Sequence, residues 1–478
     1  MALVAGALAS FIWFYELEGE AGREGASRSA AKVFPELAAS DIEWLEFTTA
    51  EGVMVRAERS EGRWTIVAPR VFPADAVTLD AMAGALADLA REQRVDVGQP
   101  LEIYGLGESE RRVRFWAAGR EHTLRVGDRT PLGSNTYVAT ADGGGASAVP
   151  TWRINALSKP LLDVRDRRVL PFDESSVARI DLRWPGGAPV SIVRDVERWR
   201  LVAPVEAPAD SARVDQLLSD LAYLRAEGFV DEPLSSQDSG LDPPDFEVAL
   251  TLGSAPAGEG GRVVRFALGR VDAAGQRLAR GRHKTLYVLG EGQLEDFPRD
   301  LNAYRARRVA GFVPAEAVRV EVSFSREGTE EPPGGASEPF ALVRRDGAWT
   351  SRPALRNGRA EDWLTTLSNL QAIVVLAESV GADERAGLGL RPPRARFRVL
   401  GRSPEGEGRA RVLAEVWIGK VDPARGVIAM RPDREEVFAL APTLLDHLPV
   451  NYTSFEEQLE GAGAGVDDAS RDQSRSGT

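Results

Sequence analysis

The sequence predicts an α+β fold: three tandem repeats of a module with antiparallel strands packed on a main helix, preceded by a short N-terminal apolar helix. Three observations predict it. A tryptophan motif recurs at Trp64, Trp199 and Trp349, a helical apolar pattern follows each tryptophan, and alternating strand-like segments follow each helix. The 478 residues also suit about three domains of ~150 residues each.

Each tryptophan follows a short strand-like run, so we expect it on the second strand of a hairpin with its ring buried. Apolar residues then recur 15, 18, 22 and 25 residues further on in all three copies, with Gln371 the one polar exception. These offsets mark one face of a helix. Asp75 and Asp210 stand where an N-cap is expected, and Ala360 takes that place in the third copy.

A Gly-Leu pair follows the helix in every copy, beginning at Gly105, Gly240 and Gly389. Alternating strands and a short apolar helix complete each module. We expect the repeated Trp and Gly positions to be structural, because tryptophan fills a core and glycine supplies positive φ angles. The predicted boundaries are 41–172 for the first module, 173–312 for the second and 313–450 for the third, with a polar, disordered tail at 451–478.

The N-terminal residues 1–15 carry no charged side chain and end in aromatic residues, while a membrane-spanning helix needs ~20 apolar residues. Three interpretations stay open: a transmembrane anchor whose start is truncated, an interfacial segment, or a buried helix. We expect the anchor, with residues 16–40 as a stalk. The aromatic belt would lie at the outer interface. The predicted location is the inner (cytoplasmic) membrane, single-pass, with the bulk of the chain periplasmic.

Composition limits the partners and the chemistry. The formal charge of −13 disfavours nucleic acid, because an acidic chain repels phosphate backbones. The absence of cysteine excludes disulfides and thiolate metal sites. The three histidines, His122, His283 and His447, lack metal-ligand spacing, and no nucleotide-binding loop is present. We therefore predict no catalytic, metal or cofactor residues, no cofactor, and no enzymatic activity.

Several ordered motifs resemble the bacterial domain of unknown function family 4340. They are the Trp64–Pro69 and Trp199–Pro204 turns, the helix after each, the Tyr104-Gly105-Leu106 element, and the Tyr-Val pairs before a strand. The likeness covers most of 41–310 and is fainter over 317–450. It implies a single-pass envelope protein, with ABC-transporter subunits of the gliding-motility type as candidate partners, and it implies no catalytic residues.

Arginine clusters end the first two modules: Arg165, Arg167 and Arg168, then Arg305, Arg307 and Arg308. We expect inter-module or partner contacts from Arg167, Arg168, Arg307 and Arg308, with a solvated linker as the alternative. The leading functional hypothesis is a non-enzymatic membrane-anchored envelope protein, accessory or scaffold to an ABC-type complex. A glycan or peptidoglycan binding module and a hydrolase with a site between modules are the alternatives.

Overall fold

A computed structural model describes most of the chain between residues 32 and 460. The residues outside the description are 1–31, 96–98, 108–110, 142, 144, 197, 233, 235–238, 254–260, 272–274, 291, 294–296, 326–338, 403–409 and 461–478. The chain divides into two compact units, Met1–Ala178 with Leu182–Pro185 and Leu218–Glu295, and Arg179–Asp181 with Gly186–Leu217 and Asp296–Thr478.

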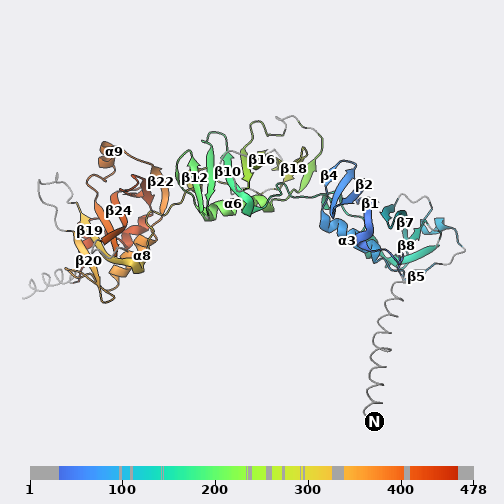
Figure 1. The fold of residues 1–478 in the computed structure, drawn as a ribbon, viewed down its shortest axis with the longest axis horizontal. Helices are drawn as coiled ribbons and strands as arrows, with labels where there is room; N and C mark the ends of the chain where they lie inside the picture. The colour runs from blue at the N-terminus through green and yellow to red at the C-terminus, as the bar shows by residue number, and fades with distance from the viewer. Residues whose placement is uncertain are drawn as a thin grey trace, which may run out of the picture. The chain divides into compact units, whose positions relative to one another are not determined.

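The first sheet has nine strands, and neighbouring strands pair antiparallel (Figure 1). Its order is β4 (Phe72–Pro73), β3 (Arg63–Ala68), β2 (Met54–Ser60), β1 (Ile42–Thr48), β6 (Arg112–Ala117), β7 (Arg120–Arg129), β8 (Asn135–Thr140), β9 (Ala146–Pro150) and β5 (Gln93–Arg94). The main helix α3 (Ala76–Ala87) follows β4 along the chain. Short helices η2 (Ala39–Asp41), η3 (Leu101–Tyr104), α4 (Thr151–Asn155) and α5 (Leu161–Val164) lie between strands or at the ends.

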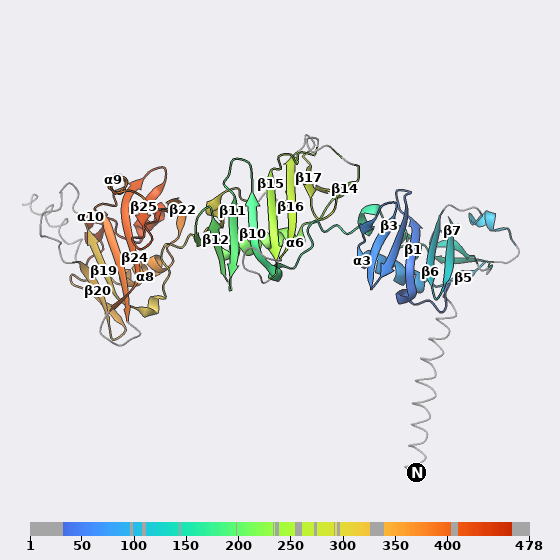
Figure 2. The same ribbon diagram turned by 45° about the horizontal axis from the view of Figure 1, so that its top comes forward.

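The middle sheet repeats this order with nine strands (Figure 2). It runs β13 (Ala207–Pro208), β12 (Arg198–Ala203), β11 (Val190–Asp195), β10 (Val177–Arg183), β15 (Phe246–Leu252), β16 (Arg262–Val271), β17 (Arg277–Arg280), β18 (Leu286–Leu289) and β14 (Gly228–Val230). Its main helix is α6 (Ser211–Tyr223), and η4 (Glu174–Ser176) and α7 (Leu301–Tyr304) are short.

The third sheet has eight strands in the matching order. They are β21 (Ala348–Thr350), β20 (Phe340–Arg345), β19 (Ala317–Phe324), β23 (Ala395–Arg402), β24 (Ala410–Asp422), β25 (Gly426–Met430), β26 (Val437–Leu440) and β22 (Ala372–Ala377). The helices are η5 (Pro314–Glu316), α8 (Arg359–Ser368), α9 (Ala382–Gly387), η6 (Pro442–Asp446) and α10 (Tyr452–Glu456). In all three sheets the strand after the main helix pairs at the far edge.

The predicted α+β class is wrong, because the structure is mostly β. Many strands are only two or three residues long, such as β4 and β5, and so short a strand leaves no alternation in the sequence. The helices expected to close the modules shrink to elements such as α7 and η6. Large antiparallel sheets therefore dominate, with one main helix for each.

The predicted membrane helix and membrane location are likewise corrected. No helix in the described part of the chain is long and apolar enough to cross a membrane. Residues 1–15, on which that prediction rested, lie outside the described residues. Of the predicted tail 451–478, residues 461–478 also lie outside them, while residues 451–460 are described and include α10.

The repeated tryptophans connect a strand to the main helix. Trp64 is 3% exposed, and its indole N–H donates to the carboxylate of Asp80 on α3 at 2.8 Å. Trp199 makes the same 2.8 Å bond to Asp215 on α6. Trp349 differs from the expectation, since it is only half-buried. The helical faces predicted from the sequence are buried, as shown by Leu79, Met82 and Leu86 at 0–1% exposed.

The repeated glycines lie where two backbone segments approach each other closely. Gly105 has φ of +69°, and a Cβ on Gly127 would lie 2.2 Å from the carbonyl oxygen of Tyr104. The third module repeats this pair, because a Cβ on Gly419 would lie 2.4 Å from the Leu388 oxygen beside Gly389. Only glycine lets the turn after the helix approach the end of the strand so closely.

Candidate functional site: arginine junctions and a basic pocket

The junction peptide 164–169 bonds through its backbone to the modules on both sides. The N–H of Asp75, the N-cap of α3, donates to the carbonyl of Val164 at 2.9 Å. On the other side, the N–H of Ala226 donates to the carbonyl of Arg167 at 2.8 Å. The peptide therefore adds to the first module and to the segment after α6 in the second.

The junction peptide 304–309 repeats this arrangement. The N–H of Asp210 donates to the carbonyl of Tyr304 at 2.9 Å, and the N–H of Ala372 donates to the carbonyl of Arg307 at 2.7 Å. The two junctions share the pattern Val/Tyr-Arg-x-Arg-Arg-Val. The same local sequence thus forms the same backbone connection twice.

Arg165 and Arg305 are the buried side chains of the two junctions, each 3% exposed. Arg165 donates to the Asp231 carboxylate at 2.8 Å, while Arg305 contacts both Glu378 and Glu436, the latter at 2.7 Å. Burial by itself would lower the pKa of Arg305. The hydrogen bonds and charges of Glu378 and Glu436 outweigh burial, so the pKa of Arg305 is raised above its ordinary value. A buried cation is tolerated in a protein when carboxylates neutralise it.

Aromatic rings surround the buried cation of the first junction. The Arg165 guanidinium lies 5.4 Å from the ring of Phe72 on β4 and 5.0 Å from the ring of Phe229 on β14. Those two rings meet edge to face, with centroids 5.2 Å apart. The ring centroids of His283 and Phe72 lie 5.1 Å apart. Burial lowers the pKa of His283. The junction therefore combines apolar packing with a neutralised charge.

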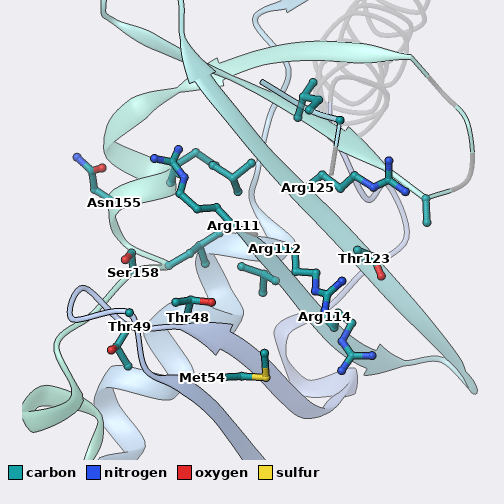
Figure 3. A pocket seen from close by; sticks show the side chains of 18 of the residues that line it. Thr48, Thr49, Met54, Arg111, Arg112, Arg114, Thr123, Arg125, Asn155 and Ser158 are labelled. Atoms are coloured by element: carbon teal, nitrogen blue, oxygen red, sulfur yellow. The ribbon is translucent and has the colours of Figure 1, made fainter. Parts of the chain in front are cut away.

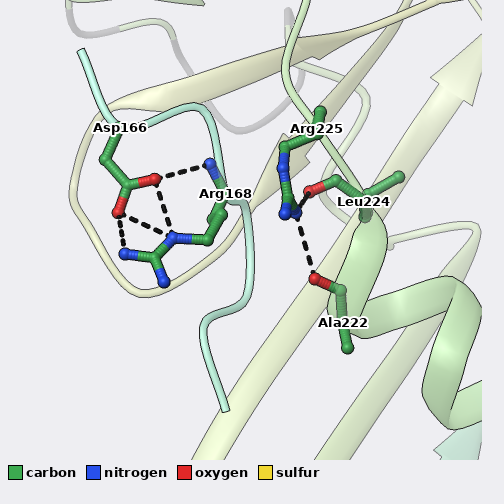
Figure 4. Close-up of polar contacts among 5 residues, drawn as sticks. All are labelled: Asp166, Arg168, Ala222, Leu224 and Arg225. Atoms are coloured by element: carbon green, nitrogen blue, oxygen red, sulfur yellow. Dashed lines mark hydrogen bonds and ion pairs between the residues drawn. The ribbon is translucent and has the colours of Figure 1, made fainter. Parts of the chain in front are cut away.

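The arginines predicted at these junctions lie on the same peptides but are less enclosed. The Arg167 side chain donates to the carbonyl of Ala226 at 2.7 Å. Arg168 is exposed, and its side chain binds Asp166 (Figure 4). The hydrogen bonds to Asp166 raise the pKa of Arg168. The backbone of Arg168 bridges to that of Arg225. Arg307 accepts through its carbonyl from Ala372.

Arg308 bridges to Gln371 through its backbone. The prediction thus named neighbours of the enclosed residues Arg165 and Arg305. The signal was present in the sequence as the first arginine of each cluster, but the sequence alone could not distinguish it from the others.

Backbone bridges like those of the junctions also occur before the first junction and after the second. Lys32 bridges to Ala90, and the N–H of Val33 donates to the carbonyl of Leu89 at 2.7 Å. In the third module Leu355 bridges to Leu459, as Ala74 bridges to Arg165 and Ala209 bridges to Arg305. Leu459 takes the place of Arg165 and Arg305 in this pairing, and it packs against the third core instead of forming an ion pair.

A separate basic pocket of about 1420 Å³ lies in the first module. Four arginines line it, together with hydroxyl and amide side chains (Figure 3). The residues that matter most are Arg111, Arg112, Arg114, Arg125, Thr48, Thr49, Thr123, Asn155 and Ser158. Glu102 and Glu121 are its acidic lining residues, so the described lining carries more positive than negative charge. Glu108 and Glu110 lie outside the described residues.

Strand register places three of the four pocket arginines, Arg112, Arg114 and Arg125, on one face of the sheet. Arg112 on β6 is directly opposite Arg125 on β7, and Arg114 is opposite Thr123. Arg114 is paired with Glu46 and Glu121, and the hydrogen bond to Glu46 raises the pKa of Arg114. Arg112 and Arg125 are exposed, and neither forms an ion pair or side-chain hydrogen bond with a described residue.

The three histidines lie apart. His122 stacks on Phe115 at 5.0 Å, His283 lies at the first junction, and the Nδ1 of His447 is 3.1 Å from Asp362. The described residues contain no group of three or more His, Asp or Glu side chains that could hold a metal ion.

These features define a protein of repeated, junction-linked β-sheet modules. A family model described as a domain of unknown function, DUF4340, matches residues 64–230 and again residues 199–391. The chain therefore belongs to the DUF4340 family, as its resemblance predicted. The two matches begin at Trp64 and Trp199, which supports the internal repeat. No curated protein matches the chain.

Proposed function

We propose that this chain is a non-enzymatic scaffold protein whose modules are joined in series by buried arginines. The observation that carries the proposal is the repeated junction: Arg165 with Asp231, and Arg305 with Glu378 and Glu436. Flexible linkers between independent domains are polar and few contacts cross them. Each of these linkers instead continues the backbone hydrogen bonding of both neighbours.

A scaffold of this kind suits an accessory role beside a larger assembly, and subunits of an ABC-type transporter are the proposed partners. The proposal takes this partner from the family resemblance. The junctions support the mechanical part, because neutralised charges and packed rings resist separation of neighbouring modules.

Affinity capture of the tagged full chain under gentle conditions tests the partner. Transporter subunits recovered in stoichiometric amount with the wild type, and lost with the double variant Arg165→Met/Arg305→Met, would support the scaffold. Recovery unaffected by the double variant would contradict a role for the junctions. Recovery of the chain alone would contradict the proposed partner.

A further inference from the structure

One face of the first sheet carries two arginines whose positive charges repel each other. Arg112 and Arg125 are a directly opposite pair on the antiparallel strands β6 and β7. Such pairs have Cα atoms about 4.5–5.5 Å apart, and like charges placed so are destabilising. Neither arginine has a described acidic partner. The pair is therefore unfavourable in the free protein and would be relieved by an anion.

The third module has no such pair, because Trp417 is opposite Arg396 where Arg125 is opposite Arg112 in the first module. Arg396 and Arg398 on β23 correspond to Arg112 and Arg114 in the sheet order. Glu415, opposite Arg398, binds Arg396 at 2.7 Å and lies 3.6 Å from Arg398. In the first module the matching position holds Thr123, which is uncharged. A hydroxyl group therefore stands in the first module where the third module has a neutralising carboxylate.

The middle module has no arginine at either of these positions. The residue opposite Glu247 is Ala267, and these two positions match Arg112 and Arg125. A basic face is therefore not required by the shared fold. Its occurrence in the first module points to binding.

The remaining lining indicates the chemistry of the ligand. Thr48, Thr123 and Ser158 supply hydroxyl groups, and Asn155 an amide, which suit a ligand rich in hydroxyl groups. In Figure 3, Asn155 and Ser158 lie on one side of the pocket and Thr123 and Arg125 on the other. A volume of about 1420 Å³ exceeds what a single small anion fills and suits several linked units.

Aromatic side chains continue the same face. Trp116 lies on the same face of β6 as Arg112 and Arg114, because every second residue of a strand shares a face. Trp44 on β1 is the cross-strand partner of Trp116. Both tryptophans are half-buried, and the guanidinium of Arg56 lies 4.2 Å from the ring of Trp44. Four residues of strand span about 13 Å, so one ligand could contact Arg112 and Trp116 together. The amphipathic face of an indole ring suits a sugar ring.

We propose that this face binds an acidic oligosaccharide, with its anionic groups held by Arg112 and Arg125. A carboxylate and a phosphate both accept two hydrogen bonds from an arginine fork, so either could be the acid on the sugar chain. The inference stands apart from the scaffold proposal, because it concerns one module and makes no use of the junctions.

Titration calorimetry on the full chain tests the site with defined probes. We would use a hexagalacturonate, a phosphorylated mannopentaose, neutral maltohexaose, a hexaglutamate peptide and a short oligothymidylate. Binding of either acidic sugar with a Kd below about 1 mM, weakened by added salt, is the expected result. Binding of the hexagalacturonate would identify the acidic group as a carboxylate, and binding of the phosphorylated mannopentaose would identify it as a phosphate. Binding of neither acidic sugar overturns the proposal, as does equal or tighter binding of the maltohexaose, peptide or oligothymidylate.

The matched variants are Arg112→Gln/Arg125→Gln in the site and Arg262→Gln/Arg265→Gln on β16. Both remove two exposed strand arginines, so the net charge changes equally. The site variant should weaken binding by about 10- to 100-fold, while the control should bind as the wild type does. An equal loss of affinity in both variants would show that binding depends on net charge alone, and would overturn the proposed site. Because the site variant removes like-charge repulsion, it should fold at least as stably as the wild type.

Discussion

Arg165, at the end of the first module, donates a hydrogen bond of 2.8 Å to Asp231 in the second. Arg305 occupies the same place one module later and reaches Glu378 and Glu436. Asp231 directly follows β14 and Glu378 directly follows β22, the corresponding edge strand, so the acidic partner keeps its place in both junctions. The second junction adds Glu436, which directly precedes β26.

Replacing Arg165 by methionine should lower the free energy of unfolding by about 2 kcal/mol. Breaking a fully buried pair costs ~3–5 kcal/mol, but Asp231 is partly exposed and would regain solvation, so we discount that figure. Calorimetry of the full chain would measure the effect as an earlier first transition. Arg168→Met is the matched control, because Arg168 is exposed and bound to Asp166; its effect should stay below about 1 kcal/mol. Equal effects would show that the enclosed arginine has no special role.

Trp64→Phe should destabilise the first module by about 1–3 kcal/mol. The change keeps an aromatic ring but leaves the Asp80 carboxylate without the indole N–H that lies 2.8 Å away. Urea unfolding followed by circular dichroism would measure the loss. The control is Trp349→Phe, which should cost less than about 1 kcal/mol because Trp349 is half-buried. A larger loss at Trp349 would contradict the assignment of the strand–helix bond.

Glycine-to-alanine changes at Gly84 and Gly127 should act in opposite directions. Gly84 lies within α3 with ordinary φ and open space around it, so alanine should stabilise by about 0.5–1 kcal/mol. A Cβ on Gly127 would lie 2.2 Å from the Tyr104 oxygen, so alanine there should destabilise by about 2 kcal/mol or more. Thermal unfolding of both variants checks the pair. A stable Gly127→Ala variant would be inconsistent with the close backbone contact.

Stability of the first junction should fall as the pH drops below about 6.5. Burial lowers the pKa of His283 from its ordinary value of 6.5, so the unfolded chain binds a proton at a pH where the folded chain does not. Protonation then favours unfolding, and the loss grows until the pH reaches the folded pKa. Thermal midpoints measured from pH 7.5 to 5 should show this slope in the wild type, and His283→Gln should flatten it. An unchanged slope in the variant would assign the pH dependence to other groups.

Local sequence determined the elements that carry their own periodicity. The apolar spacing after each tryptophan predicted the main helices, and Leu79, Met82 and Leu86 are buried on that face as expected. Family membership also followed from ordered motifs, because the motifs occur in the chain itself. The glycines at 105 and 389 were expected to supply positive φ, and both have φ of +69°.

Tertiary structure decided the sheet content and the sites. A strand such as Phe72–Pro73 exists only because Arg63–Ala68 lies beside it, and two residues carry no periodic signal. The same holds for charges: Arg165 and Arg168 look alike in the sequence, yet one is enclosed by two rings and the other is exposed. The Arg112–Arg125 pair likewise depends on strand register, which the hairpin of β6 and β7 sets. Pairing and burial are properties of contacts between distant segments, so they could not be obtained from local sequence alone.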